Sequence, residues 1–321
     1  MHYDVFNGDA DGICALIQLR LAQPIESTLI TGIKRDIQLL DKVTINQGDS
    51  LTVLDISFEK NGRRVVEFLA AGAAIFYVDH HRTGEVPNHP NLQTIIDTDN
   101  AVCTSLLVNQ YLEGKYPLWA VTAAFGDNLD TSAEKLAATL SVQDWELDKL
   151  KKLGMYINYN GYGSSVADLH FAPDVLYWEM VRYASPFDFI SENHTAFDKL
   201  ENGYQQDMTS AESIKPEYQN DAVAVFILPD VAWARRVSGV FGNHLANQNP
   251  GKAHAVLSYN KDGGFLVSVR APLSNMVGAD DFCSGFATGG GRKPAAGINH
   301  LPLDQLGLFI DKFDAFYSAK I

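Results

Sequence analysis

Acidic and imidazole side chains recur just past the ends of predicted strands in the first half of this sequence. They lie in the loop Asp9–Ala10–Asp11–Gly12, at Asp55, in the triplet Asp79–His80–His81, and at Asp127 after an apolar run. In open α/β sheets, ligands bind outside the carboxyl ends of the strands. We therefore expect four loops from separate strands to bring five carboxylates and two imidazoles to one edge of a sheet.

Five carboxylates this close together repel one another strongly unless cations lie between them. Oxygen ligands mixed with imidazole suit Mn²⁺ first, with Mg²⁺, Fe²⁺ or Zn²⁺ as alternatives, and the lack of neighbouring thiols disfavours a structural zinc site. One cation needs only about four to six ligands. The surplus predicts two metal ions roughly 3.5–4 Å apart, an arrangement that activates water and stabilises phosphoryl displacement.

Each motif alone has an ordinary structural explanation. An Asp-x-Asp-Gly loop is commonly a simple turn, and a single Asp after a strand is commonly a helix cap. Adjacent His80 and His81 after Asp79 are less common. The ordered combination at successive strand ends is what favours a metal centre over four unrelated loops.

The same four motifs, in the same order, resemble those of the DHH phosphoesterase superfamily, which takes its name from the third, here Asp79–His80–His81. The downstream run Gly289–Gly290–Gly291–Arg292–Lys293 resembles the glycine-rich signature of the companion DHHA1 domain. The strand ending in Arg270 resembles the DHHA1 strand that ends in a substrate-binding arginine. This superfamily includes the RecJ nuclease and nano-RNA hydrolases. The resemblance implies an α/β fold, with a parallel-sheet DHH domain flanked by helices and a smaller α/β DHHA1 domain.

The resemblance also implies a role for each motif. The implied metal ligands are Asp9, Asp11, Asp55, His80 and Asp127. Asp55 would bridge two cations, whereas Asp9 would hold only one of them. His81 would face the scissile phosphate as a catalytic residue, and Asp79 would fix the imidazole tautomer. Metal-activated water would attack phosphorus in line.

The chain departs from the resembled pattern in its first motif. Many members begin that motif with a His where this chain has Val5, and RecJ carries an additional Asp where this chain has Asn7. One of the two metal sites would therefore have fewer protein ligands and bind its ion more weakly. We expect the metal at Asp9 to be the more loosely bound of the two.

The glycine-rich run predicts an anion-binding surface and contains a second departure, because Arg292 stands where the family usually has His. Three consecutive glycines let the backbone approach an anion closely. An Arg is always charged and can grip phosphate with two hydrogen bonds. Arg270, Arg292 and Lys293 would then hold a terminal phosphate. The alternative is a flexible turn with a solvated Arg–Lys pair.

The elements that must position these residues follow from the pattern of the chain. Short β-rich runs alternate with helical stretches, which predicts a parallel sheet with helices on its faces. The predicted strands are 3–6, 27–31, 51–54, 74–78 and 92–96. The predicted helices are 13–22, 63–71, 102–112 and 118–124, and residues 133–205 are expected to be mainly helical.

A polar stretch without apolar periodicity, residues 206–220, predicts a linker between two domains. Residues 1–205 would form the DHH metal-binding catalytic domain and residues 221–321 the DHHA1 substrate-binding domain, with the substrate in a cleft between them. The second domain is expected to contain a strand, a helix, a β-hairpin and two further helices. Their predicted ranges are 222–228, 231–246, 253–259 with 265–270, 276–286 and 303–317.

The formal net charge of −14 is unevenly distributed. Residues 1–220 carry 16 basic and 31 acidic side chains and sum to −15, whereas residues 221–321 carry nine basic and eight acidic ones and sum to +1. Binding to long duplex nucleic acid depends on Lys and Arg replacing phosphate counterions. The acidic first domain therefore disfavours long strands and leaves short, phosphate-ended substrates open.

Cysteine usage and hydropathy indicate the compartment. Cys14, Cys103 and Cys283 cannot all pair and show no CxxC spacing, which favours a reducing environment. No run approaches the roughly 18 apolar residues of a membrane-spanning helix. We expect a cytoplasmic protein without a membrane partner, and a homodimer stays open.

These observations predict a metal-dependent phosphodiesterase that cleaves short oligonucleotides or dinucleotides by metal-activated water. Two divalent ions would be its cofactors, with Mn²⁺ favoured and Mg²⁺ as the alternative. An exopolyphosphatase, a pyrophosphatase or a nucleotide phosphatase is the competing enzyme. A hypothesis of another class is a non-catalytic nucleotide-binding regulator whose site decayed when the first His of the family was absent.

Overall fold

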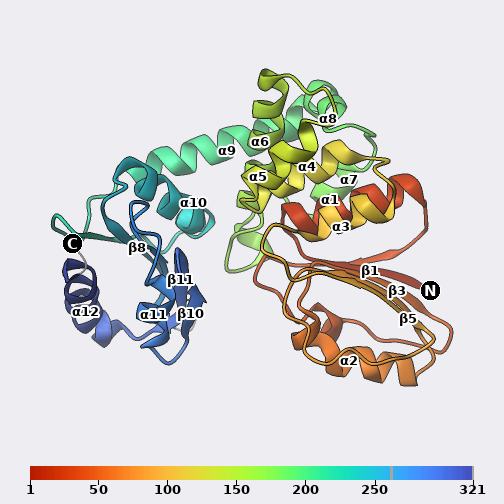
Figure 1. The fold of residues 1–321 in the computed structure, drawn as a ribbon, viewed down its shortest axis with the longest axis horizontal. Coiled ribbons are helices and arrows are strands. Elements are labelled where there is room, and N and C mark those ends of the chain that lie inside the picture. The colour runs from red at the N-terminus through yellow and green to blue at the C-terminus, as the bar shows by residue number, and fades with distance from the viewer. Residues whose placement is uncertain (261–262, 320–321) are drawn as a thin grey trace. The chain divides into compact units, whose positions relative to one another are not determined.

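The computed structural model describes residues 1–260 and 263–319. The chain divides into two compact units (Figure 1). Unit 1 comprises Met1–Gly161 and Ser165–Glu201, and unit 2 comprises Tyr162–Ser164 and the residues from Asn202 onward. The turn of the predicted hairpin includes Lys261 and Asp262, which lie outside the described residues.

Unit 1 contains a parallel sheet of five strands in the order β2-β1-β3-β4-β5. Phe6 pairs with Leu54, and Leu54 pairs with Val78, so β1, β3 and β4 end at the same edge of the sheet. The loops that follow these strands therefore leave the sheet side by side, and the predicted α/β class is confirmed. The strands are β1 (His2–Phe6), β2 (Thr28–Ile30), β3 (Ser50–Leu54), β4 (Ala74–Asp79) and β5 (Leu92–Ile96).

Helices cover both faces of this sheet (Figure 1). On one face, α2 (Phe58–Ala70) contributes Phe58, Val65 and Phe68 to a core shared with the strands. On the other face, α1 (Ala10–Ala22) is buried from Ala10 to Arg20, because α3 (Thr104–Tyr111) and α4 (Pro117–Gly126) pack against it. An apolar helix without a polar face fits such an interior position.

Further helices complete unit 1, as predicted for residues 133–205. They are α5 (Asp130–Ala137), α6 (Asp144–Asn160), α7 (Pro173–Met180), α8 (Pro186–Glu192) and the first part of α9 (His194–Glu212). Helices α4 and α6 cross so closely that a Cβ at Gly154 would lie 2.1 Å from the Thr122 carbonyl oxygen. This crossing fixes the position of the end of α4, and the residue after that helix is Asp127.

Residues 206–212, predicted to begin a linker, instead continue α9. These residues are mostly polar, so no apolar periodicity marks the helix. Three of them nevertheless lie at helical spacing and are buried, namely Asp207, Met208 and Ala211. Asp207 tolerates burial because the Arg236 guanidinium donates to it, with Nε 2.7 Å from Oδ2. The short strand β6 (Tyr218–Gln219), also within the predicted linker, already belongs to the second sheet.

Unit 2 contains a six-stranded sheet in the order β10-β11-β9-β8-β7-β6. Strands β7 and β8 are parallel, and the other neighbours are antiparallel, including the predicted hairpin of β8 and β9. The glycine-rich run forms β10, paired with β11, rather than a flexible turn. The strands after β6 are β7 (Val223–Ile227), β8 (Ala253–Tyr259), β9 (Phe265–Arg270), β10 (Gly289–Arg292) and β11 (Ala295–Leu301).

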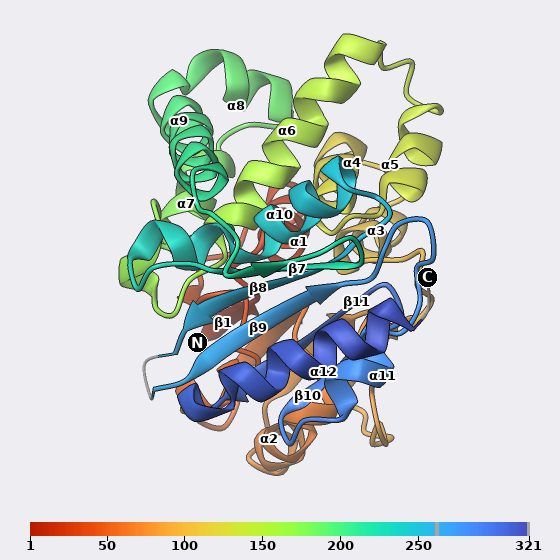
Figure 2. The same ribbon diagram turned by 90° about the vertical axis from the view of Figure 1, so that its left-hand side faces the viewer.

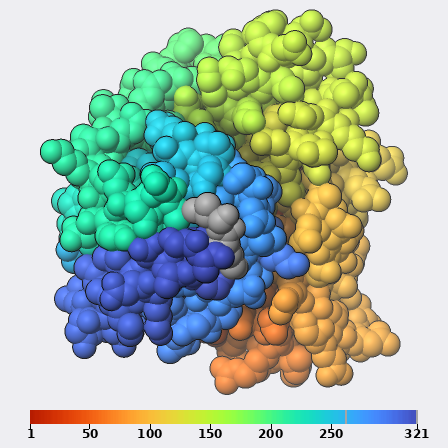
Figure 3. Space-filling view, turned by 60° about the vertical axis from the view of Figure 1, so that its left-hand side comes forward, coloured from red at the N-terminus to blue at the C-terminus, as the bar shows by residue number. Residues whose placement is uncertain are grey.

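Helices also cover both faces of the second sheet (Figure 2). Helix α10 (Ala232–Gln248) packs on β8 and β9, whereas α11 (Ala279–Ser284) and α12 (Leu306–Ser318) lie on the opposite face. Phe282, Phe309 and Phe313 form the centre of the core beneath α12, whose outer side lies on the surface of unit 2 (Figure 3). None of the described helices is long and apolar enough to cross a membrane.

Candidate functional site

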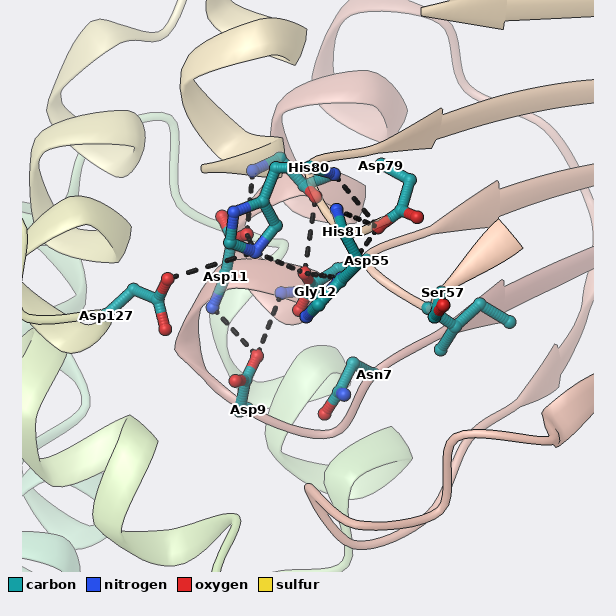
Figure 4. Close-up of polar contacts among 12 residues, drawn as sticks. Asn7, Asp9, Asp11, Gly12, Asp55, Ser57, Asp79, His80, His81 and Asp127 are labelled. Carbon is teal, nitrogen blue, oxygen red and sulfur yellow. Dashed lines mark hydrogen bonds and ion pairs between the residues drawn. The ribbon is translucent and has the colours of Figure 1, made fainter. Parts of the chain in front are cut away.

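Asp9 is the N-cap of α1, directly after β1. Its Oδ1 accepts hydrogen bonds from the backbone N–H groups of Asp11 at 3.0 Å and Gly12 at 3.1 Å (Figure 4). A glycine is required at position 12, since a Cβ there would lie 2.3 Å from the Asn7 carbonyl oxygen. The Asp-x-Asp-Gly loop is therefore a capped helix start that also presents two carboxylates at the sheet edge.

Asp11 is held by a helix from a distant part of the chain. Its Oδ2 accepts from the Thr104 N–H and its Oδ1 from the Ser105 N–H, both at 2.7 Å. These are the first N–H groups of α3, where the helix dipole favours an anion. Because four lone pairs are available on a carboxylate, both oxygens can still face a cation.

Asp55 follows β3 in a left-handed backbone conformation, with φ at 58°. Apart from Gly, Asp and Asn are among the residues that best tolerate this conformation. The Thr104 hydroxyl donates to Asp55 Oδ1 at 3.2 Å. Burial, followed by the charges of Asp11 and Asp9, raises the pKa of Asp55 well above its usual range. An ionised Asp55 therefore needs a cation beside it.

His80 offers one ring nitrogen to the carboxylates. Its Nδ1 lies 3.0 Å from the Val102 carbonyl oxygen, which can only accept, so the proton resides on Nδ1. In the neutral ring Nε2 carries the lone pair. It lies 3.3 Å from Asp55 Oδ1, 3.8 Å from Asp11 Oδ2 and 3.9 Å from Asp127 Oδ2. This is the tautomer that binds a metal ion through Nε2.

Asp127 joins this group from a helix end. The sequence places Asp127 after an apolar run, among loops grouped with strand ends, although it also predicts a helix over 118–124. In the structure Asp127 is the C-cap of that helix, α4. The helix places the carboxylate correctly because α4 is fixed by its crossing with α6 and by its contact with α1, where a Cβ at Gly126 would lie 2.4 Å from the Ala10 Cβ.

Two groups of side chains among the described residues can hold a metal ion. They are Asp11–His80–Asp127 and Asp55–His80–His81, and within each group the ligand atoms lie within 4.8 Å of one another. A cation about 2.1 Å from each ligand separates those ligands by up to about 4.2 Å. Small inward movements therefore suffice, and the donor set of carboxylates and imidazole fits Mn²⁺ or Mg²⁺.

Asp79 is committed to protein contacts and orients His81. Its Oδ1 accepts from the backbone N–H groups of His80 at 2.9 Å and His81 at 3.2 Å, and its Oδ2 accepts from the Phe58 N–H at 3.0 Å. The same Oδ1 lies 2.7 Å from His81 Nδ1. Burial opposes the charged imidazole, but the hydrogen bond and charge of Asp79 outweigh it and raise the pKa of His81. His81 is thus held as a hydrogen-bond donor.

A lysine that the sequence interpretation missed lies beside Asp9. Lys34 Nζ is 2.5 Å from Asp9 Oδ2 and 3.5 Å from Asp127 Oδ1. Burial would raise the pKa of Asp9, yet the charge and hydrogen bond of Lys34 lower it. The signal available in the sequence was a basic residue shortly after the second predicted strand, at the same sheet edge as the acidic loops.

The predicted substrate-binding arginines lie on one face of the second sheet. Arg270 on β9 pairs with Ala295 on β11, and Ala295 pairs with Arg292 on β10, so the two arginines share a face. Burial and the neighbouring Arg292 charge lower the pKa of Arg270. Two guanidinium groups on one face of a sheet suit an anion. Lys293 is exposed, and its carbonyl accepts the Ala279 N–H.

Arg270 and Arg292 differ in how firmly the protein holds them. Arg270 donates from Nε to Asn243 Oδ1 at 2.6 Å, from Nη1 to Ser268 Oγ at 2.9 Å, and from Nη2 to the Gly239 carbonyl at 3.2 Å. Arg292 is exposed at the edge strand. Arg270 therefore supplies a fixed charge, whereas Arg292 is free to reach an anion.

The three glycines of β10 also differ. A Cβ at Gly289 would lie 1.7 Å from the Cys283 carbonyl oxygen, and Gly291 has φ at 149° with its Cβ position 2.4 Å from the Ala296 Cα. A Cβ at Gly290 would meet nothing within 4 Å. Packing thus requires Gly289 and Gly291, while Gly290 leaves open space on the face that carries Arg292.

No protein-family model matches this sequence, and no curated protein is significantly similar to it in sequence. Its structure is similar to solved structures of DHH-domain proteins. Manganese-bound exonuclease RecJ has a TM-score of 0.64 at 13% identity, covering 99% of this chain and 90% of that one. The pGpG-specific phosphodiesterase PggH from Vibrio cholerae has a TM-score of 0.56 at 14% identity, covering 99% of both chains.

A further similar structure is a DHH domain described as a member of a family of ribosomal proteins, with a TM-score of 0.63 at 13% identity over 98% of this chain and 86% of that one. At these identities the likeness shows the fold. The chain therefore has the fold of DHH-domain proteins over nearly its whole length.

Proposed function

We propose that this chain is a metal-dependent phosphodiesterase that hydrolyses short oligonucleotides or dinucleotides. The observation that carries the proposal is the convergence of Asp11, Asp55 and Asp127 on Nε2 of His80. The fold supports it, because two neighbours with this fold are described as an exonuclease and a pGpG-specific phosphodiesterase.

Asp11, Asp55, His80 and Asp127 would hold a divalent ion, with Mn²⁺ favoured by the mixed donor set. When bound, such an ion lowers the pKa of a coordinated water and offsets charge on phosphoryl oxygens. His81, with Nδ1 held by Asp79 at 2.7 Å, would donate from Nε2 to a phosphoryl oxygen. The side chain of His81 is 44% exposed, so a substrate can reach it.

Residues of unit 2 would bind the terminal phosphate of the substrate. Arg292 would bind a terminal phosphate beside the fixed charge of Arg270, and Gly290 would allow the phosphate to approach the strand. This anion site would comprise few basic side chains, and residues 1–220 carry a net charge of −15. Both features favour a short substrate with a terminal phosphate over a long strand.

A substrate panel with Mn²⁺ tests the proposal. We expect mass spectrometry to show mononucleotides from a 5′-phosphorylated dinucleotide and slower hydrolysis of inorganic pyrophosphate and polyphosphate. Turnover of pyrophosphate or polyphosphate without dinucleotide cleavage would assign the competing phosphohydrolase activity. Tight dinucleotide binding with no turnover in any metal would indicate a binding protein instead.

The role of Arg292 has a separate test. Arg292→Ala should raise KM at least about tenfold for a 5′-phosphorylated dinucleotide, since a charge-assisted bidentate contact contributes about 1.5–3 kcal/mol. The KM for an aryl phosphodiester without a terminal phosphate should change little. Arg63→Ala is the matched control, because Arg63 is 83% exposed on α2. Equal losses on both substrates would contradict a terminal-phosphate site.

A further inference from the structure

We propose that the Lys34 ammonium takes the place of a second divalent cation, so that the chain binds one metal ion rather than the two that the sequence predicted. The inference rests on the proposed phosphodiesterase function and concerns the Asp9 side of the same site. It is carried by the oxygens around Lys34 Nζ, by the way the Lys34 backbone is held, and by the contacts that Asp9 has already made.

The ammonium lies among three oxygens from separate elements. Lys34 Nζ is 2.5 Å from Asp9 Oδ2, 2.9 Å from Asn158 Oδ1 and 3.5 Å from Asp127 Oδ1. An ammonium donates and cannot accept, so these oxygens match it in polarity. The side chain is 23% exposed, whereas the surface Lys42 is 49% exposed.

The backbone of Lys34 is fixed at both of its polar groups. Its N–H donates to the Gly161 carbonyl at 2.9 Å, and its carbonyl accepts from Asn7 Nδ2 at 3.2 Å. The two loops are in close contact, because a Cβ at Gly8 would lie 1.9 Å from the Gly32 carbonyl oxygen. The lysine therefore starts from a fixed point, which reduces the entropy lost on ordering its side chain. Asn7 serves this lysine as a neutral donor.

Asp9 has little capacity left for a metal ion. Its Oδ1 accepts the N–H groups of Asp11 and Gly12, and its Oδ2 accepts from Lys34. Among the described residues, both groups able to hold an ion leave out Asp9. A divalent cation at Asp9 Oδ2 would lie so close to Lys34 Nζ that strong repulsion would require the lysine to leave.

The remaining site stays complete without Asp9. Asp127 turns Oδ1 toward Lys34 Nζ and Oδ2 toward His80 Nε2, so one carboxylate connects the ammonium with the metal cluster. A single divalent ion beside a fixed ammonium still provides two positive centres for a phosphoryl group. The lysine cannot dissociate as an ion can, so this arrangement needs only one metal to be complete.

Metal stoichiometry tests the inference independently of turnover. Equilibrium dialysis followed by elemental analysis should find one Mn²⁺ per wild-type chain. Lys34→Met removes the charge with little change in length, and it should raise the stoichiometry to two. Mn²⁺ activation of hydrolysis should then change from a Hill coefficient near one to a value near two. Two equivalent ions on the wild-type chain would overturn the proposal, as would one ion on both proteins.

Three further variants guard against a folding artefact. Lys42→Met, at the exposed lysine, should leave one ion. Lys34→Arg keeps the charge and should also leave one ion. Asp9→Asn can keep the N-cap hydrogen bonds and should still bind one ion, whereas loss of the ion from this variant would overturn the proposal. A chain that binds one ion but hydrolyses no phosphodiester would refute the proposed function and leave the role of Lys34 intact.

Discussion

Position 55 requires both a residue that tolerates a left-handed backbone and a side chain that carries a negative charge. Its φ of 58° favours Asp or Asn, whereas the proposed chemistry requires a carboxylate. Asp55→Asn should therefore fold normally while kcat/KM falls at least about 100-fold, as when a group that stabilises a transition state is lost. Without metal the variant should melt at a higher temperature than wild type, because one of several mutually repelling carboxylates has gone.

Thermal melts with EDTA and with Mn²⁺ check this prediction. Mn²⁺ should stabilise the wild type more than Asp55→Asn, so the order of stability reverses when the metal is added. Asp55→Ala is the comparison variant, since Ala in the left-handed region costs about 1–2 kcal/mol. Full activity in Asp55→Asn would show that Asp55 is not a ligand of the metal centre.

Gly290 offers a substitution that separates substrate binding from folding. An added Cβ there meets nothing within 4 Å, whereas at Gly289 it would lie 1.7 Å from a carbonyl oxygen. Gly290→Ala should keep the wild-type melting temperature within about 3 °C and raise KM for a 5′-phosphorylated dinucleotide. Gly289→Ala should lower the free energy of unfolding by about 1–3 kcal/mol. If Gly290→Ala leaves KM unchanged, the phosphate does not approach this strand.

At the scale of elements, the sheet of unit 1 could be predicted because its strands are short apolar runs separated by turns. The common edge of β1, β3 and β4 followed from their parallel order, and so did the meeting of Asp11, Asp55 and His80. Three features had no such signal. The helix 118–124 was predicted, but the place of Asp127 at its end depends on the α4–α6 crossing, which the sequence does not reveal. Residues 206–212 continue a helix whose buried positions include an ion-paired Asp207.

The third unpredicted feature was the set of partners around the carboxylates. Lys34 lies in a loop, where no periodicity marks a functional position, and its role depends on contacts with residues far along the chain. Thr104 and Ser105 donate backbone N–H groups, which any residue type except proline could supply. Sequence patterns report residue types at regular spacing, so contacts of this kind remain invisible to them.

Asp4, the middle residue of β1 (His2–Phe6) in the same sheet, belongs to a buried ion pair that affects acid stability. Arg20 donates from Nε to Asp4 Oδ2 at 2.8 Å, and Ser27 Oγ donates to the same oxygen at 2.6 Å. Burial would raise the pKa of Asp4, but Arg20 and the other hydrogen bonds lower it to about 2. The pair thereby joins α1, β1 and the residue before β2.

Because the folded-state pKa of Asp4 is depressed, its contribution to stability is present above about pH 4 and is lost as the pH falls toward 2. The shift corresponds to about 2 kcal/mol. Urea unfolding at a series of pH values should show that wild type loses this amount relative to Asp4→Asn between pH 4.5 and 2. Asp148→Asn, at a carboxylate that is 59% exposed on α6, is the control. Parallel pH profiles of wild type and Asp4→Asn would contradict the assignment.

At the scale of the whole molecule, the charge distribution leads to an unusual salt dependence. Residues 1–220 carry −15 and residues 221–321 carry +1, so a long polyanion meets net repulsion while a short one needs only a local anion site. Salt normally weakens protein binding to nucleic acid because less is gained from counterion release. Here added salt should instead relieve repulsion of long strands, since the Debye length shrinks from about 30 Å at 0.01 M to about 8 Å at 0.15 M.

Rates on a 5′-phosphorylated dinucleotide and a 15-nucleotide strand, measured across that salt range, test this sign. At low salt kcat/KM should be higher for the dinucleotide than for the 15-nucleotide strand, because each additional phosphate of the longer strand adds a repelled charge. The ratio of the two kcat/KM values should approach one as salt increases. A chain that uses Lys and Arg along an extended groove would show the opposite slope, with the longer strand losing rate faster. Convergence of the two kcat/KM values with increasing salt is the result expected if the acidic residues 1–220 repel long strands and a local anion site binds the terminal phosphate.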